Sequence, residues 1–78
     1  MRYNGGAMKQ NLVQKNLGKK LIQLRNEQGK SEKEIASVMG ITKRKYSKIE
    51  QGKAVFYLRQ GIALAEYYQI SLDFFAKD

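Results

Sequence analysis

The sequence predicts a compact, all-α domain of about five short helices. Apolar residues recur at every third or fourth position in several stretches, which is the spacing of one helix face. No stretch sustains the alternation of apolar and polar residues typical of a strand, and the chain contains no proline. Its 78 residues suffice for one small hydrophobic core. We therefore expect one domain over residues 12–78, preceded by a disordered arm over residues 1–11.

The first helix is expected over residues 12–28. Its apolar stripe consists of Val13, Leu17, Leu21 and Leu24. Gly29 follows the stripe and is suited to the left-handed conformation that ends a helix.

The second helix begins with a capping box. Ser31 is followed three residues later by Glu34, so each side chain can bond the backbone amide of the other residue. The buried side of this helix is expected to consist of Ile35, Ala36, Val38 and Met39. Gly40 comes next and predicts a tight turn.

The third helix is expected over residues 43–51, with Thr42 as its N-cap and Gly52 at its end. An advance of about 100° per residue places Tyr46 and Ile49 on the inward side. The outward side then carries Lys43, Arg44, Ser47, Lys48 and Gln51. With the preceding helix and turn, residues 31–52 have the pattern of a helix-turn-helix.

The fourth helix is expected over residues 58–68, although Gly61 weakens it. Its core side is expected to consist of Leu58, Ile62 and Ala65, with Tyr68 or Leu64. A last helical turn is expected after Ser71, with Leu72 and Phe75 packing back on the core.

The amino-acid composition excludes several classes of function and favours one class of partner. The chain lacks cysteine and histidine, which excludes most nucleophilic triads and zinc sites, and we expect no enzyme activity, no metal and no cofactor. No run is long and apolar enough for a membrane span, so we expect a cytoplasmic protein. The net charge is +8, and residues 1–59 hold 14 of the 15 basic residues. A basic body of this kind suits a polyanionic partner.

The third helix suits double-stranded DNA because the major groove admits one α-helix and exposes base edges to it. As base-reading residues we expect Lys43, Arg44, Ser47 and Lys48. As phosphate contacts we expect Thr42, Lys45, Gln51 and Lys53. The alternative reading is that this side of the helix is merely a solvated, lysine-rich surface.

Glu50 lies at the edge of the inward side of the third helix, where it is expected to meet the scaffold and not the DNA. A carboxylate facing phosphates would be unfavourable. A structural ion pair between Glu50 and Arg25 of the first helix would neutralise it and fix the angle of the third helix. The alternative is that Arg25 binds phosphate.

Between Leu17 and Phe75 the sequence resembles the phage-repressor and Cro-like helix-turn-helix family, of the XRE type. The resemblance is carried by LGKKLIQLR (17–25), S-x-x-E-I-A (31–36), VMGIT (38–42), YSKIEQGK (46–53) and ALAEYYQISLDFF (63–75). It implies a five-helix Cro/repressor-like domain, usually a homodimer, that binds palindromic operators. By position, it also implies base reading by the four residues named above and the Arg25–Glu50 pair.

Three positions depart from the family pattern. Glu32 stands where glutamine is usual and would repel phosphate, with Lys33 or Lys30 as a substitute contact. Lys30 itself stands where an apolar residue is common. Phe56 replaces the usual proline in an apolar connection. The residues that we expect either in the core or in a dimer or partner contact are Phe56, Tyr57, Phe74 and Phe75.

These observations predict a sequence-specific DNA-binding transcriptional regulator, a repressor that inserts helix 43–51 into the major groove of a palindromic operator. The alternative is a protein-interaction module on the same fold, antitoxin-like or antirepressor-like, with weak or no DNA binding. In that alternative, Glu32 and the apolar residues 54–58 would mark a lost DNA contact and a protein-binding surface.

Overall fold

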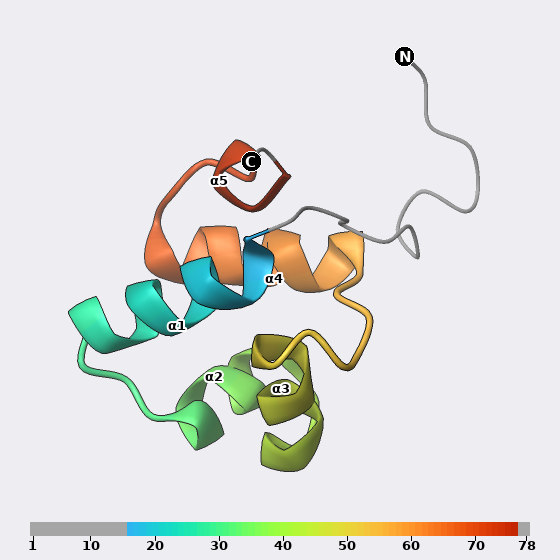
Figure 1. The fold of residues 1–78 in the computed structure, drawn as a ribbon. Helices are drawn as coiled ribbons and strands as arrows, with labels where there is room; N and C mark the ends of the chain where they lie inside the picture. The colour runs from blue at the N-terminus through green and yellow to red at the C-terminus, as the bar shows by residue number, and fades with distance from the viewer. Residues whose placement is uncertain (1–15, 77–78) are drawn as a thin grey trace.

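The structure is a computed structural model in which residues 16–76 are described, and within that range it consists of helices and connections without strands (Figure 1). The helices are α1 (Leu17–Glu27), α2 (Glu32–Met39), α3 (Lys43–Glu50), α4 (Leu58–Tyr68) and α5 (Asp73–Ala76). This confirms the predicted all-α fold with five helices. The arm predicted over residues 1–11, and Val13 of the predicted apolar stripe, lie outside the described residues.

The five helices surround one hydrophobic core. Figure 1 shows α2 and α3 together on one side of the molecule and α5 on the opposite side, with α1 and α4 between them. Helix α2 packs against α3 and α4, and α1 packs against α3. The buried core consists of Leu17, Leu21, Leu24, Ile35, Ala36, Tyr46, Ile49, Phe56, Leu64, Ala65 and Phe75. Every helix contributes to it, so no helix can shift without disturbing the packing of another.

Side-chain caps fix the ends of α2 and α3. Ser31 Oγ accepts from the Glu34 amide at 3.1 Å, and the Ser31 amide donates to Glu34 Oε1 at 3.0 Å, which confirms the predicted capping box. Gly40 ends α2 with φ +72°. Thr42 Oγ1 then accepts from the Lys45 amide at 3.1 Å and opens α3. The turn between the two helices is therefore set by local chemistry.

Two helices end one residue earlier than predicted. Helix α1 runs from Leu17 to Glu27, with Asn16 at its N-cap (φ −109°, ψ 20°), and the predicted helical residues 12–15 lie outside the described residues. At its other end, Gly29 has φ +65° and follows the last turn, as expected. Helix α3 ends at Glu50, and Gln51 is its C-cap, one residue earlier than predicted.

Helix α4 has the predicted bounds, and its predicted buried face is confirmed except at Ile62. Leu58, Leu64 and Ala65 are buried, whereas Ile62 is only half-buried. Gly61, which weakened the prediction, lies on the buried face. Gln60, which was not among the predicted core residues, is also buried, and its Oε1 accepts from the Tyr57 amide at 2.8 Å and caps the helix.

Of the four aromatic residues considered for a dimer or partner contact, two belong to the core. Phe56 and Phe75 are 2% and 0% exposed and pack edge to face, with ring centroids 5.6 Å apart. They cannot serve as surface contacts in this fold. Phe74 is exposed beside Lys20, whose Nζ donates to the Phe74 carbonyl at 2.9 Å, and Tyr57 is half-buried.

Gly18 marks the closest approach of α1 to α3. A Cβ built on Gly18 would collide with the carbonyl oxygen of Glu50 at the end of α3. The obstacle is backbone, so a flexible side chain cannot move aside to relieve it. Glycine at this position is therefore a packing requirement, although glycine generally lowers helix stability.

We predict that Gly18→Ala destabilises the protein by about 1–3 kcal/mol, because an over-packed helix contact forces the backbone to shift. In an unobstructed helix, replacing glycine by alanine would instead stabilise the protein by up to about 1 kcal/mol. The sign of the stability change therefore shows whether the position is obstructed. Denaturant unfolding followed by circular dichroism measures it. Lys19→Ala, at the exposed neighbouring position, is the control and should change stability little. A Gly18→Ala variant as stable as the control would contradict the close contact.

Candidate nucleic-acid interface

Helix α3 is divided into a buried side and an exposed side. Tyr46 and Ile49 are 0% and 2% exposed and hold the helix to the core. On the opposite side Lys43, Arg44 and Lys48 are exposed. The predicted orientation of α3 is therefore confirmed, and its cationic side chains are available to a partner.

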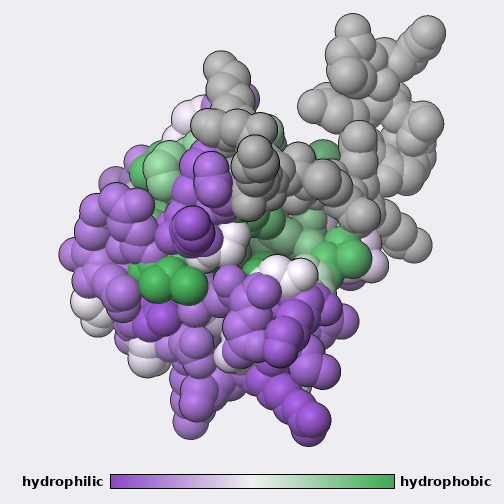
Figure 2. Space-filling view, viewed as in Figure 1, coloured by the Kyte–Doolittle hydropathy of each residue, from purple (hydrophilic) through white to green (hydrophobic). Residues whose placement is uncertain are grey.

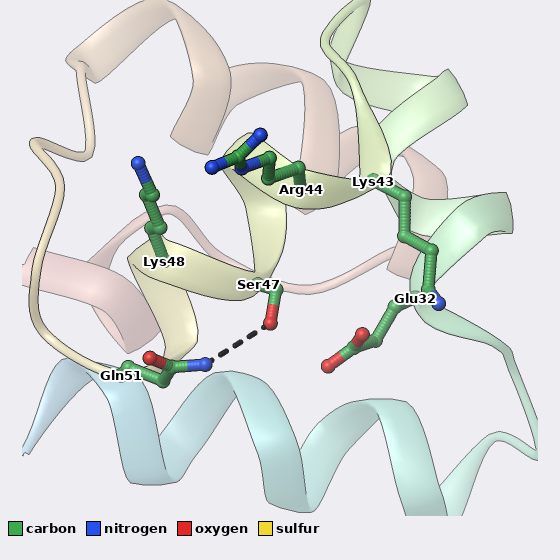
Figure 3. A pocket seen from close by; sticks show the side chains of 6 residues that line it. All are labelled: Glu32, Lys43, Arg44, Ser47, Lys48 and Gln51. Carbon is green, nitrogen blue, oxygen red and sulfur yellow. Dashed lines mark hydrogen bonds between the residues drawn. The ribbon is translucent and has the colours of Figure 1, made fainter.

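Two shallow grooves lie on either side of a ridge formed by Arg44 and Lys48. One groove is lined by Glu32, Lys43, Arg44, Ser47, Lys48 and Gln51. The other is lined by Thr42, Arg44, Lys45, Lys48, Lys53 and Ala54. In Figure 3 the side chains of Arg44 and Lys48 leave α3 in different directions, but their charged ends lie toward the same side of the helix. The structure thus places the four predicted base-reading residues around one groove and brings Thr42, Lys45 and Lys53 together along the other.

Ser47 and Gln51 add acceptor groups to this cationic surface. Gln51 Nε2 donates to Ser47 Oγ at 3.2 Å across one helical turn (Figure 3). Lysine and arginine only donate hydrogen bonds, whereas a hydroxyl and an amide can both donate and accept. The exposed side of α3 can therefore contact more than one kind of base edge.

The surface around α2 and α3 is strongly polar. In Figure 2 the part of the molecule where these two helices lie is covered by hydrophilic residues. Lys33, the predicted substitute phosphate contact, is exposed on α2. Since exposed cations attract a polyanion from a distance, the lysine and arginine side chains of α2 and α3 suit this surface to a polyanionic partner.

Arg25 and Glu50 form an ion pair between α1 and α3, in which Glu50 is buried and Arg25 is partly buried. Arg25 Nε donates to Glu50 Oε2 at 2.7 Å and Arg25 Nη2 donates to Glu50 Oε1 at 3.2 Å, so the pair is bidentate. Arg25 Nη1 also donates to the Lys30 carbonyl at 3.3 Å. The hydrogen bond to Glu50 raises the pKa of Arg25 above its ordinary value. This geometry excludes the alternative in which Arg25 is a free phosphate contact.

Glu32 occupies a place that the sequence analysis did not foresee. Its side chain lines the same groove as the predicted base-reading residues and is 27% exposed. One carboxylate oxygen lies 3.9 Å from Arg25 Nη2, at the inner edge of the groove. The sequence indicated only that Glu32 opens α2 and would repel phosphate.

Two buried tyrosine hydroxyls lie behind the interface. The hydroxyls of Tyr46 and Tyr68 have no hydrogen-bond partner among residues 16–76. Burial raises the pKa of Tyr68 to about 12. Burial, and next the neighbouring Glu50 carboxylate, raise the pKa of Tyr46 even further. Both groups are therefore held neutral, and no sequence motif could have revealed that their hydroxyls are unpaired.

Other kinds of site find no support in the part of the chain that the structure describes. Residues 16–76 contain no cluster of three or more metal-binding side chains. Within the same range, none of the helices has the length and apolar character needed to span a membrane.

Comparison with known proteins identifies the fold. A family model described as helix-turn-helix matches residues 21–75, which include all of α2, α3 and α4. The match also includes the Arg25–Glu50 pair and both grooves. Comparisons with curated proteins and with solved structures gave no significant match.

We predict that Glu50→Gln lowers the free energy of unfolding by about 1–3 kcal/mol, because a charge-assisted bidentate contact to Arg25 becomes a neutral one in a buried place. Thermal and denaturant unfolding measure the loss. Glu66→Gln makes the same chemical change at an exposed position of α4 and should have little effect. Equal stability of the two variants would mean that the buried pair does not stabilise the fold.

We also predict that the protein loses stability above about pH 10. The pKa of Tyr68 is about 12 in the folded chain against a reference value of 10.0, so its contribution is complete below pH 10. As the pH rises from 10 to 12, the unfolded chain releases the proton first and folding becomes less favourable.

Tyr68→Phe should make this pH dependence shallower, and Tyr67→Phe, at the exposed neighbouring ring, is the matched control. Unfolding midpoints between pH 8 and pH 12, an interval that includes both the reference and the folded pKa of Tyr68, measure the effect. Identical curves for the two variants would contradict the assignment to Tyr68.

Proposed function

Because the chain belongs to the helix-turn-helix family of the XRE type, we propose that this DNA-binding transcription regulator reads one particular sequence, a palindromic operator, through α3. The observation that carries the proposal is the exposed ridge of Arg44 and Lys48, with Lys43 and Ser47 beside it. A ridge with grooves on both sides has the shape needed to enter a major groove and leave room for the DNA backbones.

Specificity would come from the residues around the first groove. The guanidinium of Arg44 presents two donors that match O6 and N7 of guanine, and Lys43 and Lys48 offer single charged donors to the same edge. Ser47 can donate to or accept from several bases. Each good bidentate contact contributes about 1–3 kcal/mol of discrimination against the wrong base.

Affinity would come mainly from phosphate contacts around the second groove. Lys45 and Lys53 are exposed there, and the first amides of α3 lie beside Thr42 at the positive end of the helix dipole. Lys33 and Gln51 complete the proposed phosphate contacts. Each neutralised phosphate releases counterions, so log affinity should change by about −0.9 per phosphate for each tenfold rise in salt concentration.

The length of α3 supports a homodimer. Eight residues span about 12 Å, or about four base pairs, which is too short a sequence to single out one site in a genome. Two copies of α3 about 34 Å apart would read two half-sites one DNA turn apart. Of the four aromatic residues predicted for a dimer or partner contact, the exposed Phe74 and the half-buried Tyr57 remain available. Occupation of a promoter by such a dimer would repress transcription by excluding other proteins.

The alternative of a protein-interaction module loses its main support in the structure. It required the apolar residues 54–58 to form a binding surface. Phe56 and Leu58 of that segment are buried, and only Val55 is clearly exposed. The surface of α3 is meanwhile cationic and unobstructed, which favours DNA as the partner.

Two double variants with the same change of charge test the division of roles. Arg44→Ala with Lys48→Ala should remove discrimination between an operator and a random duplex, because the two substitutions remove proposed base contacts. Lys45→Ala with Lys53→Ala should weaken binding to both duplexes alike and make the slope of log affinity against log salt shallower by about 3.6, because the dimer loses two phosphate contacts on each subunit. Fluorescence anisotropy over a range of salt concentrations measures both effects, on an operator selected from a random duplex pool.

Circular dichroism should show both double variants folded, because all four side chains are exposed. If the Arg44, Lys48 variant still preferred the selected operator as strongly as the unchanged protein, α3 would not be the reading element. If no duplex were enriched from the pool at all, sequence-specific binding itself would be refuted.

A further inference from the structure

Glu32 is the one acidic residue that lines the groove of the proposed base-reading residues. The other five lining residues are cationic or neutral and polar: Lys43, Arg44, Ser47, Lys48 and Gln51. Glu32 begins α2, and Figure 3 shows its carboxylate projecting from that helix toward the side of the groove where Ser47 and Gln51 lie. An acidic group is unexpected in a DNA-binding groove, because DNA is a polyanion and its phosphates repel a carboxylate.

The carboxylate of Glu32 has capacity to accept hydrogen bonds from a ligand. Among residues 16–76 it accepts no hydrogen bond, and its distance of 3.9 Å from Arg25 Nη2 is too long for one. Arg25 directs its shorter bonds to Glu50 and to the Lys30 carbonyl. The carboxylate is thus placed by its position on α2 and by the field of Arg25, with its lone pairs still able to accept.

A carboxylate in this position restricts what the groove can bind. It accepts hydrogen bonds and does not donate them, and it is repelled by phosphate. In the major groove, guanine and thymine present acceptors at the corresponding edge, whereas cytosine N4 and adenine N6 present amino donors. An exocyclic amino group is therefore the group on DNA that this carboxylate fits.

We propose that Glu32 is a specificity-determining residue of the DNA interface, which selects an exocyclic amino group of cytosine or adenine at one position of each half-site. The inference rests on the proposed function and deepens it. Glu32 shares its groove with Arg44 and Lys43, whose preferred target is guanine. A cation on guanine and a carboxylate on a nearby amino group together specify more of the sequence than cations alone.

The repulsion of phosphate has a second consequence for specificity. Non-specific binding consists almost entirely of contacts between cations and phosphates. A carboxylate within the interface weakens every such complex, whereas in the specific complex it gains a hydrogen bond. Glu32 thus widens the difference between specific and non-specific affinity, which is the quantity that matters against a genome of competing sites.

The test compares three full-length proteins: the unchanged chain, Glu32→Gln and Glu27→Gln. The two variants carry the same change of charge, but Glu27 is exposed at the end of α1 and lines neither of the two grooves. Each protein is used to select duplexes from a random pool, and its affinity is then measured for the selected operator, for every single-base change in one half-site and for one random duplex.

For the unchanged protein, one half-site position should prefer cytosine or adenine on one strand by about 5- to 150-fold over guanine or thymine. Glu32→Gln should reduce that preference to a few-fold at the same position and nowhere else, because an amide both donates and accepts. It should also bind the random duplex about threefold or more tightly at low salt. Glu27→Gln should leave the base preferences unchanged.

A purely structural role for Glu32, through Arg25, would give a different result. Glu32→Gln would then melt at a lower temperature and weaken binding to every duplex by the same factor, with unchanged base preferences, and this outcome would overturn the proposal. The proposal would also be overturned if Glu32→Gln had the same base preferences and the same affinities as the unchanged protein. If the unchanged protein selected no sequence, the proposed function would fail. If it selected a sequence whose preferences Glu32→Gln did not alter, only the role of Glu32 would fail.

Discussion

The orientation of α3 depends on Glu50. Its carboxylate receives two hydrogen bonds from Arg25, and its backbone carbonyl lies where α1 has no side chain, at Gly18. One residue therefore joins the end of α3 to α1 both by charge and by close backbone packing. The observed angle of α3 therefore requires both the absence of a side chain at Gly18 and a positive charge at Arg25. Since a reading helix must meet base edges with ångström accuracy, this junction is what turns a cationic helix into a possible DNA reader.

Arg25 extends this junction to α2. The same guanidinium that pairs with Glu50 also binds the Lys30 carbonyl, just before α2, and lies near Glu32 at the start of that helix. A planar group with several fixed donors can serve three partners at once, which the single ammonium of lysine cannot do with the same geometry. One side chain of α1 thus contacts both the start of α2 and the end of α3. These contacts fix the position of the two helices around the groove relative to each other.

The sequence predicted most of the fold because its local signals are strong. The box of Ser31 and Glu34, the glycine at Gly40 and the cap at Thr42 each depend on residues within a few positions of each other, so they could be identified without a structure. The division of α3 into two sides follows from helical geometry alone. Even the partner of Glu50 was accessible, because a buried carboxylate requires a cation and Arg25 follows the same stripe as Leu21 and Leu24.

What the sequence did not reveal depends on contacts between distant elements. That Gly18 faces a carbonyl of α3 depends on how closely α1 and α3 approach, and no local pattern encodes that distance. The burial of Phe56 depends on how the last turn folds over the core, because the Phe56 ring packs against that of Phe75. The place of Glu32 in the groove depends on the crossing of α2 and α3.

The separation of roles along α3 has a consequence for how such a protein can change. The side chains that hold the helix, Tyr46, Ile49 and Glu50, are buried, whereas Lys43, Arg44 and Lys48 contribute nothing to the core. Exposed positions tolerate replacement with little effect on stability. The outward side chains can therefore be exchanged for others while the scaffold stays intact. A single fold of this kind can acquire a new target sequence in a few steps, and the same freedom is open to deliberate retargeting.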